Sequence, residues 1–116
     1  MTPPANAALV VTTTHDAEDK ARALAAAVVG ERLAACAQVY PIRSVYRWEG
    51  EVQDAAEWRT DFKTRADLGD RLTAYIRAHH DYDTPEVIAV PVVAGSDAYL
   101  GWVAAETAES AEAAED

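Results

Sequence analysis

Two long extended segments joined by a tight turn constrain the fold of this chain more than any other feature. They cover residues 35–48 and 51–64, and Gly50 between them supplies the backbone freedom that a hairpin turn needs. In the second segment largely apolar side chains alternate with charged ones. The largely apolar set is Ala56, Trp58, Thr60 and Phe62, and the charged set is Glu57, Arg59, Asp61 and Lys63. This period of two residues is typical of a strand with one buried face.

The length of this hairpin indicates that part of it projects from the domain. At about 3.3 Å per residue, arms of roughly 14 residues reach about 45 Å, which exceeds the core of a domain of this size. Tyr46 and Trp48 lie near the turn. We therefore expect a projecting hairpin whose aromatic tip packs against a partner.

The N-terminal part of the chain predicts one strand followed by one helix. Residues 9–14 form a β-branched run of strand length. Alanine and other apolar side chains then recur at helical spacing over residues 16–32. Either Thr14 or Asp16 can cap this helix at its start.

The C-terminal half of the chain predicts a second helix, a strand and a final helix. Apolar side chains recur at helical spacing over residues 64–80, where Thr64 and Asp67 are spaced as a capping box. The composition of residues 87–92 predicts a buried strand, and residues 97–105 predict a short helix.

The order strand, helix, strand, strand, helix, strand is the split plan of α+β ferredoxin-like folds. Its second and fourth strands lie at the sheet edges, where proline is tolerated, and Pro41 and Pro91 fall in those strands. We predict a ferredoxin-like βαββαβ sandwich over residues 8–103, with a long hairpin and a short C-terminal helix. Residues 1–7 then form an N-terminal extension, and residues 104–116 form an acidic tail that is predicted to be disordered.

The formal net charge of −10 is concentrated in the last third of the chain. Residues 1–42 carry three bases and four acids, residues 43–77 carry seven of each, and residues 78–116 carry nine acids and no base. An acidic surface repels nucleic acids and anionic membranes and attracts cations. No apolar run approaches the roughly 20 residues that cross a bilayer, and no signal-peptide pattern is present, so we expect a cytoplasmic protein.

Cys36 is the single cysteine, which excludes a disulfide within one chain. In an apolar stretch such a residue is more often a small buried hydrophobe than a reactive or metal-ligating thiol. A cysteine nucleophile would need a histidine and a third orienting residue, and no flanking signature points to them. The sequence also has no phosphate-binding glycine loop and no nucleophile elbow. We predict no catalytic residue, no enzymatic activity and no organic cofactor.

Imidazole and carboxylate groups gather in one segment where the chain leaves a helix, His79-His80-Asp81-Tyr82-Asp83-Thr84-Pro85-Glu86. These groups suit a borderline divalent ion such as Cu²⁺ or Zn²⁺. Adjacent helical residues point about 100° apart, however, so His79 and His80 cannot easily hold one ion without further ligands. The alternative is structural: His79 packs on the apolar helix face, and His80 caps the last carbonyl groups. Glu86 is the carboxylate that we expect to be held in place.

Five short sequence elements are each a weak signal alone, but together, in this order and at this spacing, they form a specific one. They are Leu33-Ala34-Ala35-Cys36, Tyr46-Arg47-Trp48-Glu49-Gly50, Lys63-Thr64, His79-His80-x-Tyr82-x-Thr84-Pro85-Glu86 and Tyr99-Leu100-x-Trp102. With these elements the chain resembles the CutA family of divalent-cation tolerance proteins over about residues 8–103. One departure is Asp81, which stands where many relatives have proline and adds a carboxylate oxygen.

The resemblance implies a ferredoxin-like subunit in a PII-like homotrimer whose edge strands pair between subunits. The family is linked to tolerance of copper and other divalent cations, and its animal members to anchoring of acetylcholinesterase. Carried over by position, the candidate metal ligands are Cys36, His80, His79 and Glu86, and the candidate contacts to a small ligand are Tyr82, Lys63 and Trp48.

Three hypotheses about function follow from these patterns. The main one is a trimeric protein that binds or responds to a divalent ion, Cu²⁺ or Zn²⁺. The second is a PII-like sensor of a small molecule in the cleft between subunits. The third is an architectural or adaptor trimer that binds a protein partner and has no ligand of its own.

Overall fold

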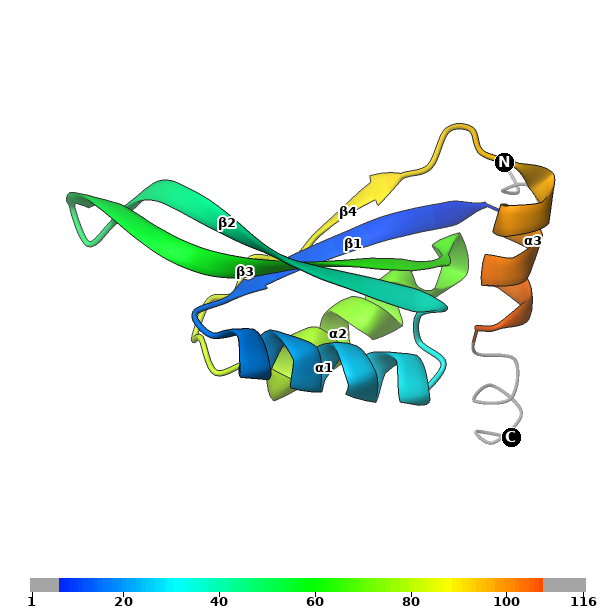
Figure 1. Cartoon of the computed structure of the whole chain (residues 1–116), viewed down its shortest axis with the longest axis horizontal. Helices are drawn as coiled ribbons and strands as arrows, with labels where there is room; N and C mark the ends of the chain where they lie inside the picture. Colours follow the sequence, from blue (N-terminus) through cyan, green and yellow to red (C-terminus); the bar gives the residue numbers. More distant parts are fainter. Residues whose placement is uncertain (1–6, 108–116) are drawn as a thin grey trace.

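The computed structural model describes residues 7–107 of the chain and has the predicted ferredoxin-like order of elements (Figure 1). The elements are β1 (Ala8–His15), α1 (Glu18–Gly30), β2 (Cys36–Trp48), β3 (Glu51–Arg65), the 3-10 turn η1 (Ala66–Leu68), α2 (Gly69–His79), β4 (Ile88–Pro91) and α3 (Asp97–Ala105). Helices α1 and α2 cover one face of the sheet, and α3 lies at the end of the molecule opposite the hairpin turn.

The four strands form one antiparallel sheet in the order β2-β3-β1-β4. Strands β2 and β4 are therefore the edges, as predicted from Pro41 and Pro91. Proline at an edge costs no ladder hydrogen bond when its position faces away from the neighbouring strand. The central strand β1 pairs with β3 over its full length and with β4 over Leu9 to Thr12.

The hairpin of β2 and β3 projects beyond the rest of the sheet, as the length of its arms predicts. The pairing of β1 with β3 ends at His15 opposite Trp58, whereas β2 and β3 continue to pair as far as Trp48 opposite Glu51. Glu49 and Gly50 turn the chain with positive φ values of 51° and 80°, the pair of conformations that a two-residue hairpin loop requires. The longest dimension of the molecule is 44 Å, in line with the predicted reach of about 45 Å.

The hydrophobic core lies between the sheet and the helices α1 and α2. Val11 on β1 and Phe62 on β3 are paired neighbours with no exposed surface. The helical side chains packed on them are Leu24, Ala25, Val28, Leu72 and Ile76. Because side chains alternate across a strand, the pairing of Val11 with Phe62 decides which residues of β1 and β3 face the helices.

The predicted helix caps are wrong. Helix α1 begins at Glu18 after Ala17, and no side chain of the described residues caps it. The hydroxyl of Thr64 does not cap α2; it donates to the carbonyl oxygen of Leu33 at 2.7 Å. Strand β3 continues through Arg65, so Thr64 lies within the sheet. Helix α2 begins only at Gly69, after the η1 turn.

The prediction of a buried last strand is wrong for the single chain, because all four residues of β4 are exposed. As an edge strand β4 pairs with β1 alone, and Ile88 and Val90 remain about half exposed. Helix α3 continues to Ala105, two residues past the predicted end of the domain, and Thr107 is buried. The rest of the predicted tail lies outside the described residues.

Replacing Phe62 by alanine should lower the free energy of unfolding by about 3–5 kcal/mol, because a buried aromatic ring leaves a cavity between the sheet and both helices. Chemical denaturation followed by circular dichroism measures this loss. The control is Arg22→Ala on the exposed side of α1, which should leave the unfolding midpoint nearly unchanged. Equal effects of the two substitutions would contradict the placement of the core.

Candidate metal centre

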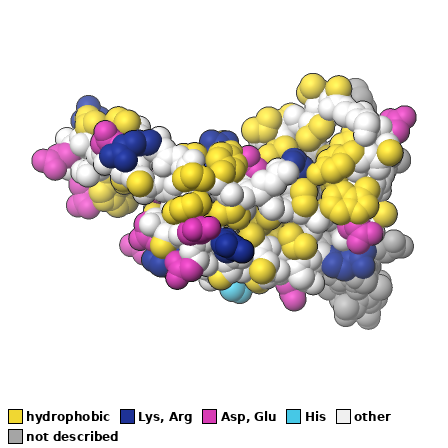
Figure 2. Space-filling model, viewed as in Figure 1, with side chains coloured by type: hydrophobic (Ala, Val, Ile, Leu, Met, Phe, Trp, Pro, Cys, Tyr) yellow, Lys and Arg dark blue, Asp and Glu magenta, His cyan; other side chains and the backbone are white. Residues whose placement is uncertain are grey.

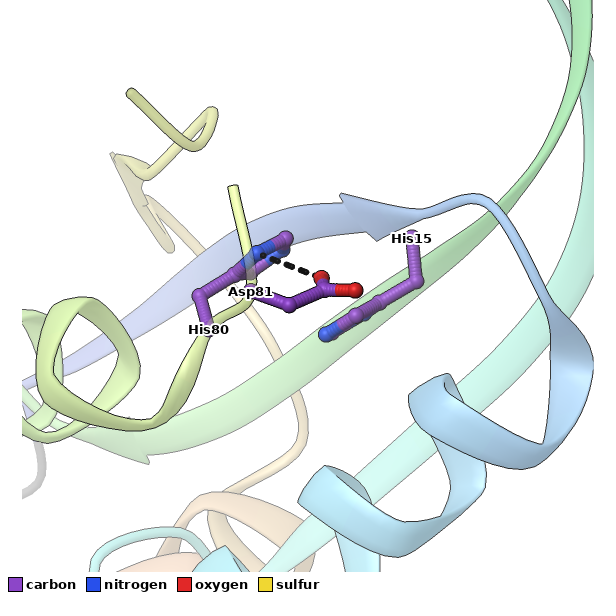
Figure 3. A group of neighbouring side chains, drawn as sticks. All are labelled: His15, His80 and Asp81. Carbon is purple, nitrogen blue, oxygen red and sulfur yellow. Dashed lines mark ion pairs between the residues drawn. The ribbon is translucent and has the colours of Figure 1, made fainter. Parts of the chain in front are cut away.

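Three potential metal ligands converge where the end of β1 meets the segment that follows α2. They are His15, His80 and Asp81, and each offers one ligand atom within 4.8 Å of the others. Figure 3 shows the three side chains approaching one another from these two parts of the chain. The sequence motifs did not include His15, because it lies 64 positions before His79 and only the fold brings them together.

His80 is held by two hydrogen bonds that indicate its tautomer. Its Nε2 lies 2.7 Å from the carbonyl oxygen of Thr14, and its Nδ1 lies 3.0 Å from the backbone nitrogen of Tyr82. A carbonyl can only accept and a backbone N–H can only donate, so the proton is on Nε2 and Nδ1 is the acceptor. Both nitrogens of this fully buried ring are therefore used within the protein.

The rings of His15 and His80 stack, with centroids 4.0 Å apart and an angle of 10° between their planes. An imidazole binds a metal ion through a lone pair that lies in the plane of its ring. Two nearly parallel planes do not meet at one ion, so this stack cannot chelate a metal through both histidines. His80 becomes a ligand only if its ring leaves the stack and gives up the bond from Tyr82.

His15 has the nitrogen that remains available. The residue is 3% exposed, and its Nδ1 is buried without a hydrogen-bond partner among the described residues. Burial lowers the pKa of His15, and the neighbouring His80 lowers it further, against the opposing effect of Asp81 and Asp16. The ring is therefore neutral at neutral pH, which is the form that binds metal ions.

Asp81 is ionised and shares a cation with a second carboxylate. The ammonium group of Lys20 lies 2.6 Å from Asp81 and 2.9 Å from Asp16. The bond from Lys20 is the largest cause that lowers the pKa of Asp81, and the two carboxylates in turn raise the pKa of Lys20. Oδ1 of Asp81 also lies 3.5 Å from Nδ1 of His80, a contact that is an ion pair only when that ring is protonated (Figure 3).

The site opens into a hollow of about 360 Å³ between α1 and α2. Its polar end is formed by His15, Lys20, Asp81 and His79, and its apolar wall by Ala23, Leu24, Ala27 and Tyr75. An ion at this position could thus be reached from solvent.

We predicted, as the alternative to metal binding, that His79 packs on the apolar helix face and that His80 caps the helix. In the structure these two roles are reversed. His79 is exposed, stacks on Tyr75 and places its Nδ1 2.8 Å from the carbonyl oxygen of that residue, one turn earlier in α2. His80, which was expected to cap the helix, instead turns inward and packs against His15. The helix ends at His79, so the next side chain takes its direction from an extended residue.

The predicted ligands Cys36 and His80 lie on opposite faces of the sheet. Cys36 is paired with Lys63, which is paired with Val10, and this row faces away from α1 and α2. His80 packs on His15, which shares the helix-covered face with Val11. The structure therefore does not bring the thiol and this imidazole together within one chain.

Cys36 belongs to a separate polar group near α3. Its sulfur lies 3.3 Å from the hydroxyl of Tyr99, and this hydrogen bond is the main cause that raises the pKa of Tyr99 to about 12. The ammonium group of Lys63 lies 5.9 Å from the centroid of the Tyr99 ring and 2.5 Å from Oε1 of Gln38. This cluster places a thiol and a cation together, but it is remote from the histidines.

The other predicted site residues do not gather in one place, although the ring of Tyr82 packs against that of His80 with centroids 4.7 Å apart. Tyr82 is half-buried and its hydroxyl donates to Glu57 on β3 at 3.0 Å. Glu86 is exposed, and Trp48 is 52% exposed at the tip of the hairpin. Within one chain these three residues do not form a common site.

Comparison with known proteins identifies the family. The model of the CutA1 divalent ion tolerance protein matches residues 9–106, which is most of the chain. The chain belongs to the CutA1 family. The resemblance read from its sequence motifs is therefore confirmed, together with the ferredoxin-like fold.

Relatives from plants and bacteria align with nearly the whole described domain. The chloroplastic protein CutA 1 of rice (Oryza sativa subsp. japonica) is 45% identical over 103 residues, which are 88% of this chain and 58% of the rice protein. A divalent-cation tolerance protein CutA of Yersinia pestis is 42% identical over 83% of this chain and 82% of its own length. The crystal structure of CutA1 from Oryza sativa superimposes with a TM-score of 0.85 at 43% identity, covering 89% of this chain and 95% of that one.

Membership of the CutA1 family does not fix a cellular compartment, because the rice relative is named a chloroplast protein. The cytoplasmic location stays a prediction. Within residues 7–107 no helix combines the length and the apolar character that crossing a membrane requires.

Replacing His80 by leucine should destabilise the protein by about 2–5 kcal/mol, because the buried Thr14 carbonyl and Tyr82 N–H lose their partners. Thermal and urea unfolding measure the change. The matched control, His79→Leu, removes one exposed hydrogen bond and should cost much less. Equal losses, or a ring proton on Nδ1 of His80 in ¹⁵N NMR spectra at pH 8, would contradict the assigned tautomer.

Proposed function

We propose that this chain is a homotrimeric protein that binds a divalent cation through His15 and Asp81 and has no enzymatic activity of its own. The observation that carries the metal part is the buried imidazole of His15, which has a ring nitrogen without a hydrogen-bond partner among the described residues and offers a ligand atom within 4.8 Å of a carboxylate oxygen of Asp81. The family description, divalent ion tolerance, supports the same reading.

The donor set fits an ion of borderline softness. A neutral imidazole together with a carboxylate suits Zn²⁺ or Cu²⁺ better than Mg²⁺ or Ca²⁺, which prefer oxygen alone. Structural zinc sites use four protein ligands, whereas two leave positions for water or for a further ligand. Such an incomplete site exchanges its ion readily, which suits a response to cation concentration better than permanent storage.

The surface of the single chain supports assembly into a trimer. Both sheet edges, β2 and β4, have unpaired backbone groups on their outer side, and open edges of this kind are commonly covered. Large exposed hydrophobic residues lie on the hairpin, on β4 and on α3, and they include Val45, Trp48, Val52, Ile88, Val90 and Trp102. Figure 2 shows hydrophobic side chains across one face, from the hairpin to the end at which α3 lies.

The two edges differ from each other, which favours a closed ring. A contact between β2 of one subunit and β4 of the next is heterologous, so it leaves a free edge of each kind until the ring closes. Closure with three subunits would cover every edge and would give the projecting hairpin a neighbour to pack on.

Light scattering should therefore give a molar mass of three subunits. Substitution Val90→Lys on β4 places a charge on the exposed edge strand and should shift the protein toward the monomer. The control Ala78→Lys, on the exposed side of α2, should remain trimeric. A monomeric wild-type protein would refute the proposed assembly.

Titration calorimetry with Zn²⁺ and Cu²⁺ tests the metal site. The variants His15→Phe and Asp81→Asn each remove one ligand while keeping a similar shape, and each should weaken binding by at least about tenfold. Cys36→Ser, on the opposite face of the sheet, serves as the control and should bind as the wild type does. Affinity that depends on Cys36 but not on His15 would move the site to the opposite face of the sheet.

A further inference from the structure

Lys20 occupies an unusual place beside the candidate metal centre. Its ammonium group lies between two carboxylates, 2.9 Å from Asp16 and 2.6 Å from Asp81. Asp16 lies in the connection from β1 to α1, whereas Asp81 follows α2, so the fold brings these carboxylates together from distant parts of the sequence. The three side chains are each about half exposed.

The position of this ammonium group has the properties of a cation site. Two negative charges face it, and His15, whose buried Nδ1 accepts no hydrogen bond within residues 7–107, lines the same hollow. Without the positive charge of Lys20, the carboxylates would repel each other across the space between them. One imidazole nitrogen and two carboxylates are a donor set that suits a borderline divalent ion.

We propose that Lys20 is a built-in competitor for this site: a divalent ion displaces its ammonium group from Asp81 and Asp16, and Asp16 then becomes a third ligand beside His15 and Asp81. This inference rests on the proposed metal-binding function and specifies how that function is regulated. It makes the ion pair of Lys20 the resting form of the site, and it sets the concentration of divalent ion that the protein requires before it binds.

Lys20 can leave without disturbing the fold. Its side chain is a flexible four-carbon stem that is 44% exposed, and ion pairs at that exposure contribute little to stability because water screens them. The adjacent hollow has an apolar wall of Ala23, Leu24 and Ala27, against which the stem can pack while the charge stays in water.

The displacement also follows from charge. When Lys20 is bound, the two carboxylates share one positive charge. When a divalent ion is bound, they share two positive charges, which neutralise both carboxylates. A divalent ion thus interacts more strongly with the pair than an ammonium group does at a similar distance. The neutral nitrogen of His15 adds a donor that an ammonium group cannot use, since lysine has only hydrogens to offer.

The test is titration calorimetry with Zn²⁺ on the full chain at pH 7.5, comparing wild type with Lys20→Met. Methionine keeps an unbranched stem and removes the charge, so the variant should bind Zn²⁺ at least about tenfold more tightly. Adding Asp16→Asn to Lys20→Met should abolish that gain. Lys63→Met, on the other face of the sheet, is the matched control and should bind as the wild type does. NMR of the Lys20 ammonium group gives an independent readout, because its signal should shift to that of a solvated lysine as zinc binds.

The outcomes separate this inference from the proposed function. If wild type binds zinc through His15 and Lys20→Met binds no more tightly, the competition is overturned and the metal site stands. If Asp16→Asn leaves the gain intact, Asp16 is not a ligand and the inference is overturned in that part. If neither wild type nor Lys20→Met binds zinc or copper, the proposed metal function fails and this inference fails with it.

Discussion

The position of β1 between β3 and β4 determines the rest of the structure. The strand is paired on both sides, and its side chains, as in any strand, alternate between the face covered by the helices and the face that is not. Val11 fills the core on the covered face, and His15, four residues later, reaches the same face where α1 begins. The carbonyl of Thr14 is the acceptor that draws in His80. The core and the candidate metal centre are thus successive parts of one strand.

His80 connects the sheet to the segment that carries Asp81. Its neutral ring satisfies one backbone acceptor on β1 and one backbone donor after α2, two groups that would otherwise be buried without partners. The stack with His15 fixes the angle of both rings. A histidine that looks like a metal ligand therefore acts as a support, and in the proposed site the ligand is the ring that it supports. Metal sites commonly depend on such supporting contacts as much as on the ligands themselves.

Properties that repeat along the chain were predictable from the sequence, and single contacts between distant segments were not. The period of two over residues 51–64 predicted the hairpin, and proline positions predicted both edges. Hydrophobic composition misled for β4, because it cannot distinguish a strand inside a core from an edge strand whose apolar side chains are exposed. The exchange of roles between His79 and His80 depended on the residue at which α2 stops, which periodicity does not locate. His15 had no local signal, since its partners come from the other end of the domain.

Because the chain is acidic, selectivity for a divalent ion in the proposed site would depend on His15 and Lys20. A formal net charge of −10 attracts every cation, so it cannot by itself distinguish a divalent metal from sodium or from a lysine side chain. Discrimination needs a donor that hard cations use poorly, which a neutral imidazole provides. It also needs a competing group that weakly bound cations cannot displace. In the proposed site that group is the ammonium of Lys20, which is held by two carboxylates. Selectivity in this site would therefore come from one buried nitrogen and one tethered charge rather than from the acidic surface around them.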